Sequence, residues 1–284
     1  MKKNNTLIGD SVDNVKNNII QNLQQNGISK CYEFLNKKNL DIVEKILIKN
    51  KGIKGNKNSF YYRSRKNYLL KKILNFEIIG FLNSLKLISL SKKLKLKELS
   101  EEILRKPAKL SSIDSYFSPI SSNKVFDWHC DQAYSGELQP KKFLNPDHAA
   151  IKYFIYLTDV SKNNGCLGYL PQSHKILYFL KLGILNGEIK YKPYWRLNDL
   201  RNILKNDDYK NYLEEKIDSE SIVKFLEQSD FIINHPHDTY EYDFNLKKGD
   251  ALIFDESGVH RAAETLKTDR LVLRFIYKNI NAPD

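Results

Sequence analysis

The chain has 284 residues and a formal net charge of +12, with 41% hydrophobic and 28% charged positions. This hydrophobic fraction is far above that of disordered chains, so the chain can bury a sizeable core. Glu77 and Lys86 interrupt the most apolar segment, 73–90, and no stretch of about 18 uncharged apolar residues remains. The sequence therefore predicts a globular protein without a membrane span.

The N-terminal residues and the cysteines indicate a cellular compartment. Residues 1–5 are polar and lead into no apolar secretory segment. The three cysteines, Cys31, Cys130 and Cys166, are scattered and form no CxxC pair, which argues against a disulfide framework or a zinc knuckle. We expect a reducing, cytoplasmic environment.

The first 110 residues have the pattern of a mainly helical layer packed on the rest of the protein. Apolar positions at helical spacing predict helices over 10–25, 30–50, 68–90 and 94–104. Gly27 is a plausible end for the first helix, and residues 52–58 predict a loop.

From residue 111 to residue 284 the pattern changes to short β-rich runs separated by turn residues. Strands are predicted over 115–117, 124–131, 149–159, 167–171, 243–246, 251–255 and 271–277. Residues 175–229 interrupt this series with a helical pattern, and we expect this insertion to act as a lid or specificity element. The layout predicts an α+β protein built around a sandwich or barrel of short strands.

The positive charge is concentrated in the N-terminal part. Residues 1–110 contain 24 Lys or Arg against 9 Asp or Glu, whereas the remaining residues contain 22 against 25. One interpretation is a surface that attracts nucleic acid, a phosphorylated ligand or an acidic partner. The other is a generic solvated surface, which is favoured because 21 of those 24 cations are lysines and arginine is the usual recognition cation.

Three residues form a candidate metal site. His129 and Asp131 stand two positions apart in a run with strand character, so both side chains share one face and Cys130 points away. His260 follows the predicted strand 251–255 and is the candidate for a third ligand. Two histidines and one carboxylate form the facial triad of non-haem Fe(II) oxygenases, although a His-x-Asp pair alone also occurs by chance.

Two arginines follow the distal histidine. Arg270 and Arg274 share one face of the predicted strand 271–277 and its N-terminal flank, so both can point into a barrel. An inward guanidinium beside a metal needs an anionic partner, and the carboxylate of a keto-acid cosubstrate matches its fork. The alternative is a surface strand with solvated cations.

A longer run connects these features to a known family. Asn-Asn-Gly-Cys-Leu over 163–167 is followed by Leu-Pro-Gln-Ser-His-Lys over 170–175, between the His-x-Asp pair and His260. In this order the motifs resemble those of the phytanoyl-CoA dioxygenase family of Fe(II)/2-oxoglutarate oxygenases. The resemblance covers roughly residues 111–178 and 240–278. The chain departs from the family at Gln172, where glycine is usual, and at Cys130, where glutamine is usual.

The resemblance implies a double-stranded β-helix core, a jelly-roll or cupin-like fold, that uses Fe(II), 2-oxoglutarate and O2. The residues that match the family's iron ligands are His129, Asp131 and His260. The matching cosubstrate residues are Arg270 for the distal carboxylate, with Arg274 as second choice, Phe154 as an aromatic contact, and Tyr116 as a weaker candidate. Trp128, Gln132 and Tyr134 flank the ligands and are candidates for the substrate pocket.

The implied activity is 2-oxoglutarate-dependent oxidation by C–H activation, with hydroxylation as the default outcome. The substrate is expected to be a small molecule, and an anionic or carrier-tethered one if the basic N-terminal part is functional. Two alternatives remain: a non-catalytic, metal-binding cupin-like module, and a basic surface that binds nucleic acid or another anion. Arg270 separates the first alternative from the oxygenase, because such a module needs no inward arginine.

Overall fold

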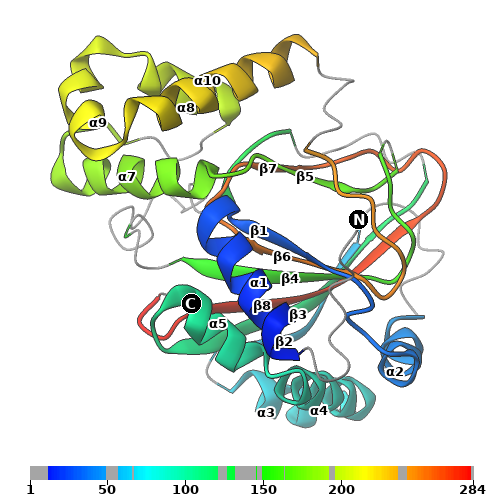
Figure 1. The fold of residues 1–284 in the computed structure, drawn as a ribbon. Coiled ribbons are helices and arrows are strands. Elements are labelled where there is room, and N and C mark those ends of the chain that lie inside the picture. Colours follow the sequence, from blue (N-terminus) through cyan, green and yellow to red (C-terminus); the bar gives the residue numbers. More distant parts are fainter. Residues whose placement is uncertain are drawn as a thin grey trace.

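A computed structural model describes most of the chain (Figure 1). The described residues are 12–48, 57–65, 67–120, 127–131, 145, 149–162, 164–191, 196–235 and 242–282.

Helices and strands alternate in the first part of the chain. In chain order these elements are α1 (Val12–Asn26), β1 (Ile28–Cys31), α2 (Lys37–Leu47), β2 (Lys57–Arg63), α3 (Tyr68–Leu74), α4 (Ile78–Lys93) and α5 (Leu96–Leu104). The N-terminal layer that was predicted to be helical therefore also supplies two strands.

The second part contains two groups of strands separated by helices. The first group is β3 (Ala108–Ser118), β4 (Ala150–Tyr156) and β5 (Leu167–Tyr169). The helices are α7 (Ser173–Asn186), α8 (Leu197–Leu204), a short 3-10 helix (Asp207–Tyr209), α9 (Lys210–Lys216) and α10 (Ser219–Asn234). The second group is β6 (Ala251–Asp255), β7 (His260–Ala262) and β8 (Arg270–Asn279). The helical pattern of the predicted insertion is confirmed, with slightly wider bounds.

Several predicted boundaries were wrong. The helix predicted over 30–50 starts only at Lys37, because residues 28–31 pair with β6, with Ile28 opposite Phe254. Gly27, at φ 77°, ends α1 as predicted. The helix predicted over 68–90 divides into α3 and α4 at Phe76, which adopts φ 57°.

Two predicted strands and one predicted loop also differ from the structure. Within 124–131 only residues 127–131 are described, and His129 forms two isolated bridges, to Arg196 and His260, rather than part of a strand. Residues 243–246 form bridges through Asp243 and Leu246 alone. The loop prediction over 52–58 is wrong at its last two residues, which begin β2 and pair with β3.

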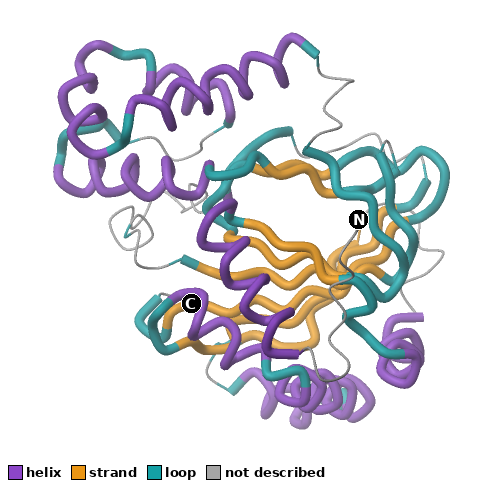
Figure 2. The backbone as a smooth tube through the Cα atoms, viewed as in Figure 1, coloured by secondary structure: helices purple, strands orange, loops and turns teal. Residues whose placement is uncertain are grey.

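Two antiparallel sheets form the centre of the molecule. The larger has the strand order β1-β6-β4-β8-β3-β2, and the smaller pairs β5 with β7. The two sheets face each other, with α3, α4 and α5 on the far side of the larger sheet and α7–α10 grouped separately (Figures 1 and 2). This is the double-stranded β-helix with added helices that the family resemblance implied.

Three hydrophobic clusters hold these layers together. The first joins side chains of α1, α2, α4 and α5 to one face of the larger sheet, with Leu87, Tyr153 and Phe275 fully buried. The second lies among α7–α10, and the third between the two sheets, around Tyr169 and Phe254. Hydrophobic burial thus fixes one helical group to the sheet and gives the other a core of its own.

The structure also bears on the cysteines and on membrane crossing. All three cysteines are buried and free, as expected from their scattered positions. Among the residues described above, no helix combines the length and the apolar character needed to cross a bilayer.

Candidate active site

Two histidines meet through backbone pairing between a loop and β7. The N–H of His129 donates to the carbonyl of His260 at 3.0 Å, and the N–H of His260 donates back at 2.8 Å. Each ring is oriented by a carbonyl two residues earlier. The Nδ1 of His129 donates to Asp127 at 2.6 Å, and the Nδ1 of His260 donates to Gly258 at 2.8 Å. Both Nε2 atoms are therefore left as acceptors for a metal.

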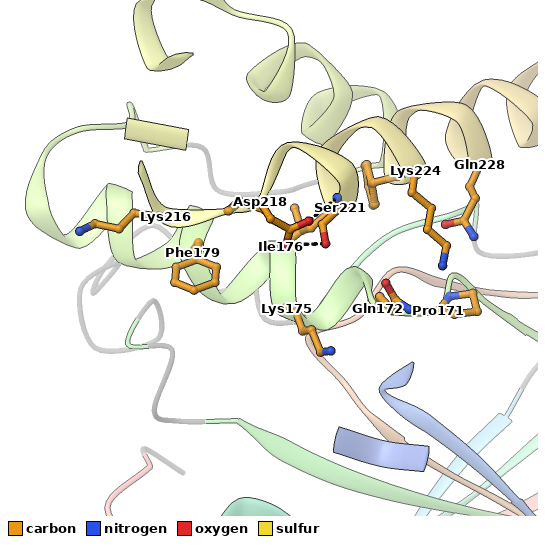
Figure 3. Close-up of a pocket in the computed structure, with 12 residues that line it drawn as sticks. Pro171, Gln172, Lys175, Ile176, Phe179, Lys216, Asp218, Ser221, Lys224 and Gln228 are labelled. Carbon is orange, nitrogen blue, oxygen red and sulfur yellow. Dashed lines mark hydrogen bonds between the residues drawn. The ribbon is translucent and has the colours of Figure 1, made fainter. Parts of the chain in front are cut away.

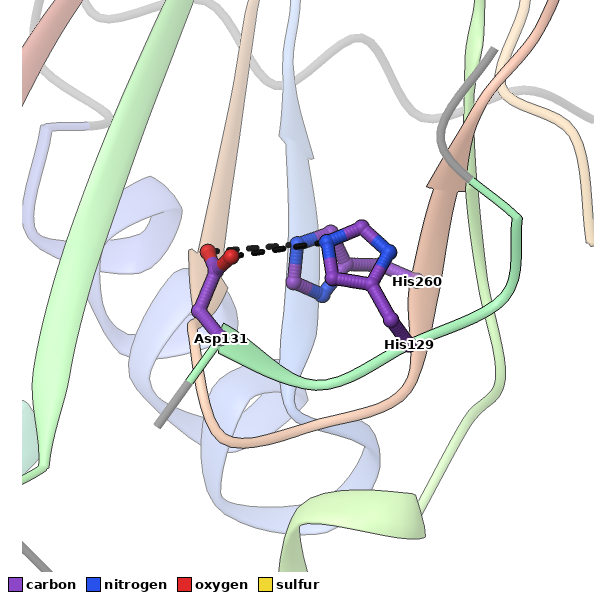
Figure 4. Close-up of side chains that lie close together, drawn as sticks. All are labelled: His129, Asp131 and His260. Carbon is purple, nitrogen blue, oxygen red and sulfur yellow. Dashed lines mark ion pairs between the residues drawn. The ribbon is translucent and has the colours of Figure 1, made fainter. Parts of the chain in front are cut away.

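Asp131 completes this cluster. Its carboxylate oxygens lie 3.4 Å from the Nε2 of His129 and 3.4 Å from the Nε2 of His260 (Figure 4). The three donor atoms lie within 4.8 Å of one another. The predicted residues therefore converge, although the bridge to His260 rather than a strand brings them together. Two imidazoles and one carboxylate on one side suit Fe(II).

Lys152, which the sequence analysis missed, lies beside this cluster. It is on β4, buried, and its ammonium contacts Asp131 and reaches the carboxylate of Glu256 at 3.4 Å. Burial by itself would raise the pKa of Asp131, but the charge of Lys152 holds it well below its usual range. The available signal was a lysine within the apolar run 149–157.

A cavity of about 400 Å³ adjoins the three ligands. Its lining combines the three ligands with aromatic and cationic side chains. The full set is Asn58, Tyr116, His129, Asp131, Lys152, Phe154, Tyr156, Leu167, His260, Arg261, Ala262, Arg270, Val272 and Arg274. All four predicted cosubstrate residues therefore face the same cavity as the predicted metal ligands.

Three of the cations that line this cavity have carboxylate partners. Arg274 donates from Nε to Asp114 at 2.5 Å. Arg261 contacts both carboxylate oxygens of Asp243 at 2.8 Å. Lys152, as described above, is paired with Asp131 and Glu256.

Arg270 is different. Its terminal nitrogens donate to the carbonyl of Gly165 at 3.2 Å and to the hydroxyl of Ser118 at 3.0 Å. Within the described part of the chain its buried Nε has no partner, and no carboxylate pairs with the guanidinium. Burial lowers its pKa. A buried guanidinium remains charged and costs free energy without an anion, so this position favours an anionic ligand.

A family comparison adds to this geometry. Residues 74–270 match the family model described as phytanoyl-CoA dioxygenase (PhyH). The chain belongs to the PhyH family. The match is wider than the motifs suggested, because it begins in α3 and includes the helices α7–α10.

Solved structures with the same fold are distant in sequence. The epimerase SnoN, in complex with Fe3+, alpha ketoglutarate and nogalamycin RO, is 12% identical, with TM-score 0.53 over 94% of this chain and 84% of SnoN. The carbocyclase SnoK from nogalamycin biosynthesis is 14% identical, with TM-score 0.52 and coverage of 92% and 83%. HygX from Streptomyces hygroscopicus, with nickel and 2-oxoglutarate bound, is 13% identical, with TM-score 0.52 and coverage of 93% and 87%. No curated protein matches the chain significantly in sequence.

One departure from the family pattern has a structural consequence. Gln172 precedes α7 where other PhyH proteins usually have glycine, and it adopts φ 67°, in the left-handed region. Its N–H donates to the carbonyl of Asn26 at 3.0 Å, which ties this turn to the end of α1. The turn is thus made without glycine, at a cost in backbone strain.

The remaining predicted substrate residues are placed differently. Trp128 is not among the residues that line the cavity. It packs edge-on against Tyr242 and lies 5.4 Å from the guanidinium of Arg261, which does line the cavity. Gln132 and Tyr134 lie outside the described residues.

The helices α7–α10 pack against the chain neighbours of the candidate ligands, on the side away from the cavity. Their hydrophobic core includes Cys130, which points away from the ligands as predicted, and Val259. These residues are the chain neighbours of all three ligands. The N–H of Leu197, at the start of α8, also donates to the carbonyl of Trp128 at 3.1 Å. None of the described residues in α7–α10 lines the cavity, and the expected lid role of this insertion stays a prediction.

Proposed function

We propose that this PhyH protein is an Fe(II)- and 2-oxoglutarate-dependent dioxygenase that hydroxylates a small molecule by C–H activation. His129, Asp131 and His260 hold the iron, and Arg270 binds the distal carboxylate of 2-oxoglutarate. Tyr116 and Phe154 contact the cosubstrate. When bound, the iron and 2-oxoglutarate activate O2 and oxidise a C–H bond of the substrate, with release of succinate and CO2.

The observation that carries this proposal is the charge of Arg270. Arg270 and Arg274 both line the cavity, and their guanidinium carbons lie 5.5 and 5.6 Å from the ring centre of Tyr116. Asp114 already pairs with Arg274, whereas Arg270 finds only a hydroxyl and a carbonyl as hydrogen-bond partners among the described residues. A cosubstrate carboxylate would complete the pairing of Arg270 and compensate its burial. This favours Arg270 over Arg274 as the residue that binds the distal carboxylate of 2-oxoglutarate.

The other residues of the site orient the metal ligands and keep water away from the reacting atoms. Backbone carbonyls hold both imidazole rings with Nε2 toward the metal position. Lys152 keeps the Asp131 carboxylate ionised and aimed between the two histidines. Phe154, Leu167 and Val272 make part of the cavity wall apolar, which limits the access of water to the reacting atoms.

Hydroxylation is proposed as the default outcome because it needs only a C–H bond near the iron. SnoN and SnoK are named as an epimerase and a carbocyclase, so the same fold also serves other reactions. Placement of the substrate decides among such outcomes. An anionic or carrier-tethered small molecule remains the proposed substrate class if the basic N-terminal part guides binding.

The test is a substrate-library screen with protein loaded anaerobically with Fe(II), reading succinate release after O2 is admitted. We expect one compound class to raise succinate release well above the substrate-free rate, with a matching product of added oxygen. His129→Ala is the inactive control. If no compound raises succinate above that control and 2-oxoglutarate does not bind, the non-catalytic metal-binding module is correct instead.

A further inference from the structure

The hairpin formed by α3 and α4 exposes an unusual number of large apolar side chains. In 73–79 every residue is exposed, and Phe76 at the turn is 88% exposed. The exposed large apolar residues of the hairpin are Leu70, Ile73, Leu74, Phe76, Ile78, Ile79, Leu82 and Leu85. A contiguous apolar surface of this kind on a globular protein commonly marks an interaction site.

Helix α4 is apolar on two sides for different reasons. One side faces the larger sheet and buries Leu87 and Leu90. The other side, which carries Ile78, Leu82 and Leu85, is exposed. Packing on the sheet explains the first side only, because an ordinary surface helix is polar on its outer face.

The outer side of α4 changes from apolar to basic along the helix. Ile78, Ile79 and Leu82 occupy its first turns, and the exposed Lys86, Lys92 and Lys93 follow on the same side. At about 1.5 Å per residue, these lysines lie roughly 10–20 Å beyond Ile79 along the axis. The hairpin therefore has an apolar tip and a basic collar.

The hairpin and its neighbours in the sequence carry a large excess of positive charge. Residues 57–97 contain eleven Lys or Arg and a single acid, Glu77, which pairs with Lys72 at 3.7 Å. This segment holds much of the N-terminal excess of positive charge. An apolar tip with a basic collar is complementary to an anionic lipid surface, where apolar side chains enter the acyl boundary and lysines meet the headgroups.

We propose that the α3–α4 hairpin attaches the protein to the surface of an anionic lipid bilayer, without crossing it. The tip residues around Phe76 enter the interface, and the collar of Lys86, Lys92 and Lys93 contacts lipid phosphates. The hairpin lies on the side of the larger sheet away from β5 and β7, so attachment leaves the α7–α10 group clear of the membrane (Figure 1).

Charge also argues against a second copy of the chain as the occupant. A two-fold contact through the tip would place one basic collar beside the other, with only Glu77 on each copy to offset the repulsion. A groove between α7 and α10, lined by Lys175, Lys216 and Lys224, makes a weaker surface site, because Asp218 lies within it (Figure 3).

The test is flotation of the full-length protein with phosphatidylcholine vesicles that contain or lack phosphatidylglycerol. We expect binding to the anionic vesicles, which salt weakens, and little binding to the neutral ones. The double variant F76E/I79E should bind the anionic vesicles about tenfold more weakly or worse, because it removes the inserting side chains. The triple variant K86E/K92E/K93E should lose on the order of a hundredfold.

Matched controls lie on the other helical group. Val223 is 52% exposed on α10, and Lys210 is exposed on α9, so V223E and K210E change an exposed apolar residue and an exposed lysine outside the hairpin. Both should bind vesicles like the unchanged protein. The proposal is overturned if the unchanged protein stays with the soluble fraction, or if the hairpin variants float as well as the controls. Concentration-dependent dimers that F76E abolishes, without vesicle binding, would assign the tip to a second copy.

Discussion

The two groups of helices belong to different hydrophobic cores. Helices α1, α2, α4 and α5 pack into the same hydrophobic cluster as the larger sheet, and the tip of α3–α4 remains outside it. Helices α7–α10 build a separate cluster whose members include Cys130 and Val259, the neighbours of the three candidate ligands. The first group therefore packs on the scaffold, and the second packs against the chain neighbours of the proposed metal ligands from outside the cavity.

The largest expected effect is the loss of activity when a proposed metal ligand is replaced, because none of these ligands lies in either group of helices. His129→Ala, Asp131→Ala and His260→Ala should each abolish turnover, because each removes a metal ligand, while the fold remains largely intact. Succinate release measures turnover, and circular dichroism checks that the fold is retained. His235→Ala, at the exposed end of α10, is the matched control. Full activity in any of the three ligand variants would end the metal assignment.

Leu200→Ala and Leu87→Ala test the comparison of the two groups directly. Both leucines are fully buried, Leu200 in the cluster with Cys130 and Leu87 in the cluster with the sheet. Each change should lower the free energy of unfolding by about 2–5 kcal/mol, measured by urea denaturation. Only Leu200→Ala should also weaken Fe(II) binding, measured by anaerobic titration. Equal loss of Fe(II) affinity in both variants would show that the two groups support the site alike.

Arg270→Lys and Arg274→Lys compare the two arginines of β8. Arg270→Lys keeps the charge but loses the two-pronged contact, so the affinity for 2-oxoglutarate should fall by about 1–3 kcal/mol. Arg274→Lys should change it less, because a lysine can still pair with Asp114. Calorimetry of the Fe(II)-loaded variants without O2 gives both values. A larger loss in Arg274→Lys would reverse the assignment.

The smallest effect concerns the turn that joins the two groups. Gln172 stands at φ 67° between the end of α1 and the start of α7. Gln172→Gly should relieve about 1 kcal/mol of strain, partly offset by the greater freedom of glycine in the unfolded chain. Thermal denaturation should therefore show a slightly higher or unchanged midpoint. A clear loss of stability would mean that the side chain contributes more than the turn costs.

The part of the site that could be predicted from the sequence depends on short spacings. His129 and Asp131 are two residues apart, and Arg270 and Arg274 alternate on one strand, so local geometry already groups them. The strand 251–255 was predicted with the bounds that the structure shows, because it is a continuous apolar run after a turn.

The remainder depends on contacts between distant segments. The pairing of Arg274 with Asp114 spans 160 residues, and the proposal that Arg270 rather than Arg274 binds an anion depends on it. Lys152 lies on β4 and Glu256 directly follows β6, two neighbouring strands whose register the sequence does not reveal. Strands β1 and β2 are short and polar in part, and they form because β6 and β3 offer partners. Such long-range pairing overrides local propensity.

The most direct test of the central claim removes, in turn, the Arg270 guanidinium and the distal carboxylate that it is proposed to bind. Binding of 2-oxoglutarate and of 2-oxopentanoate, which lacks the distal carboxylate, is measured on the Fe(II)-loaded protein and on Arg270→Met. We expect the unchanged protein to prefer 2-oxoglutarate by roughly 1–3 kcal/mol, and Arg270→Met to bind the two compounds alike. An undiminished preference in Arg270→Met, or none in the unchanged protein, would contradict the assignment of this cavity to 2-oxoglutarate.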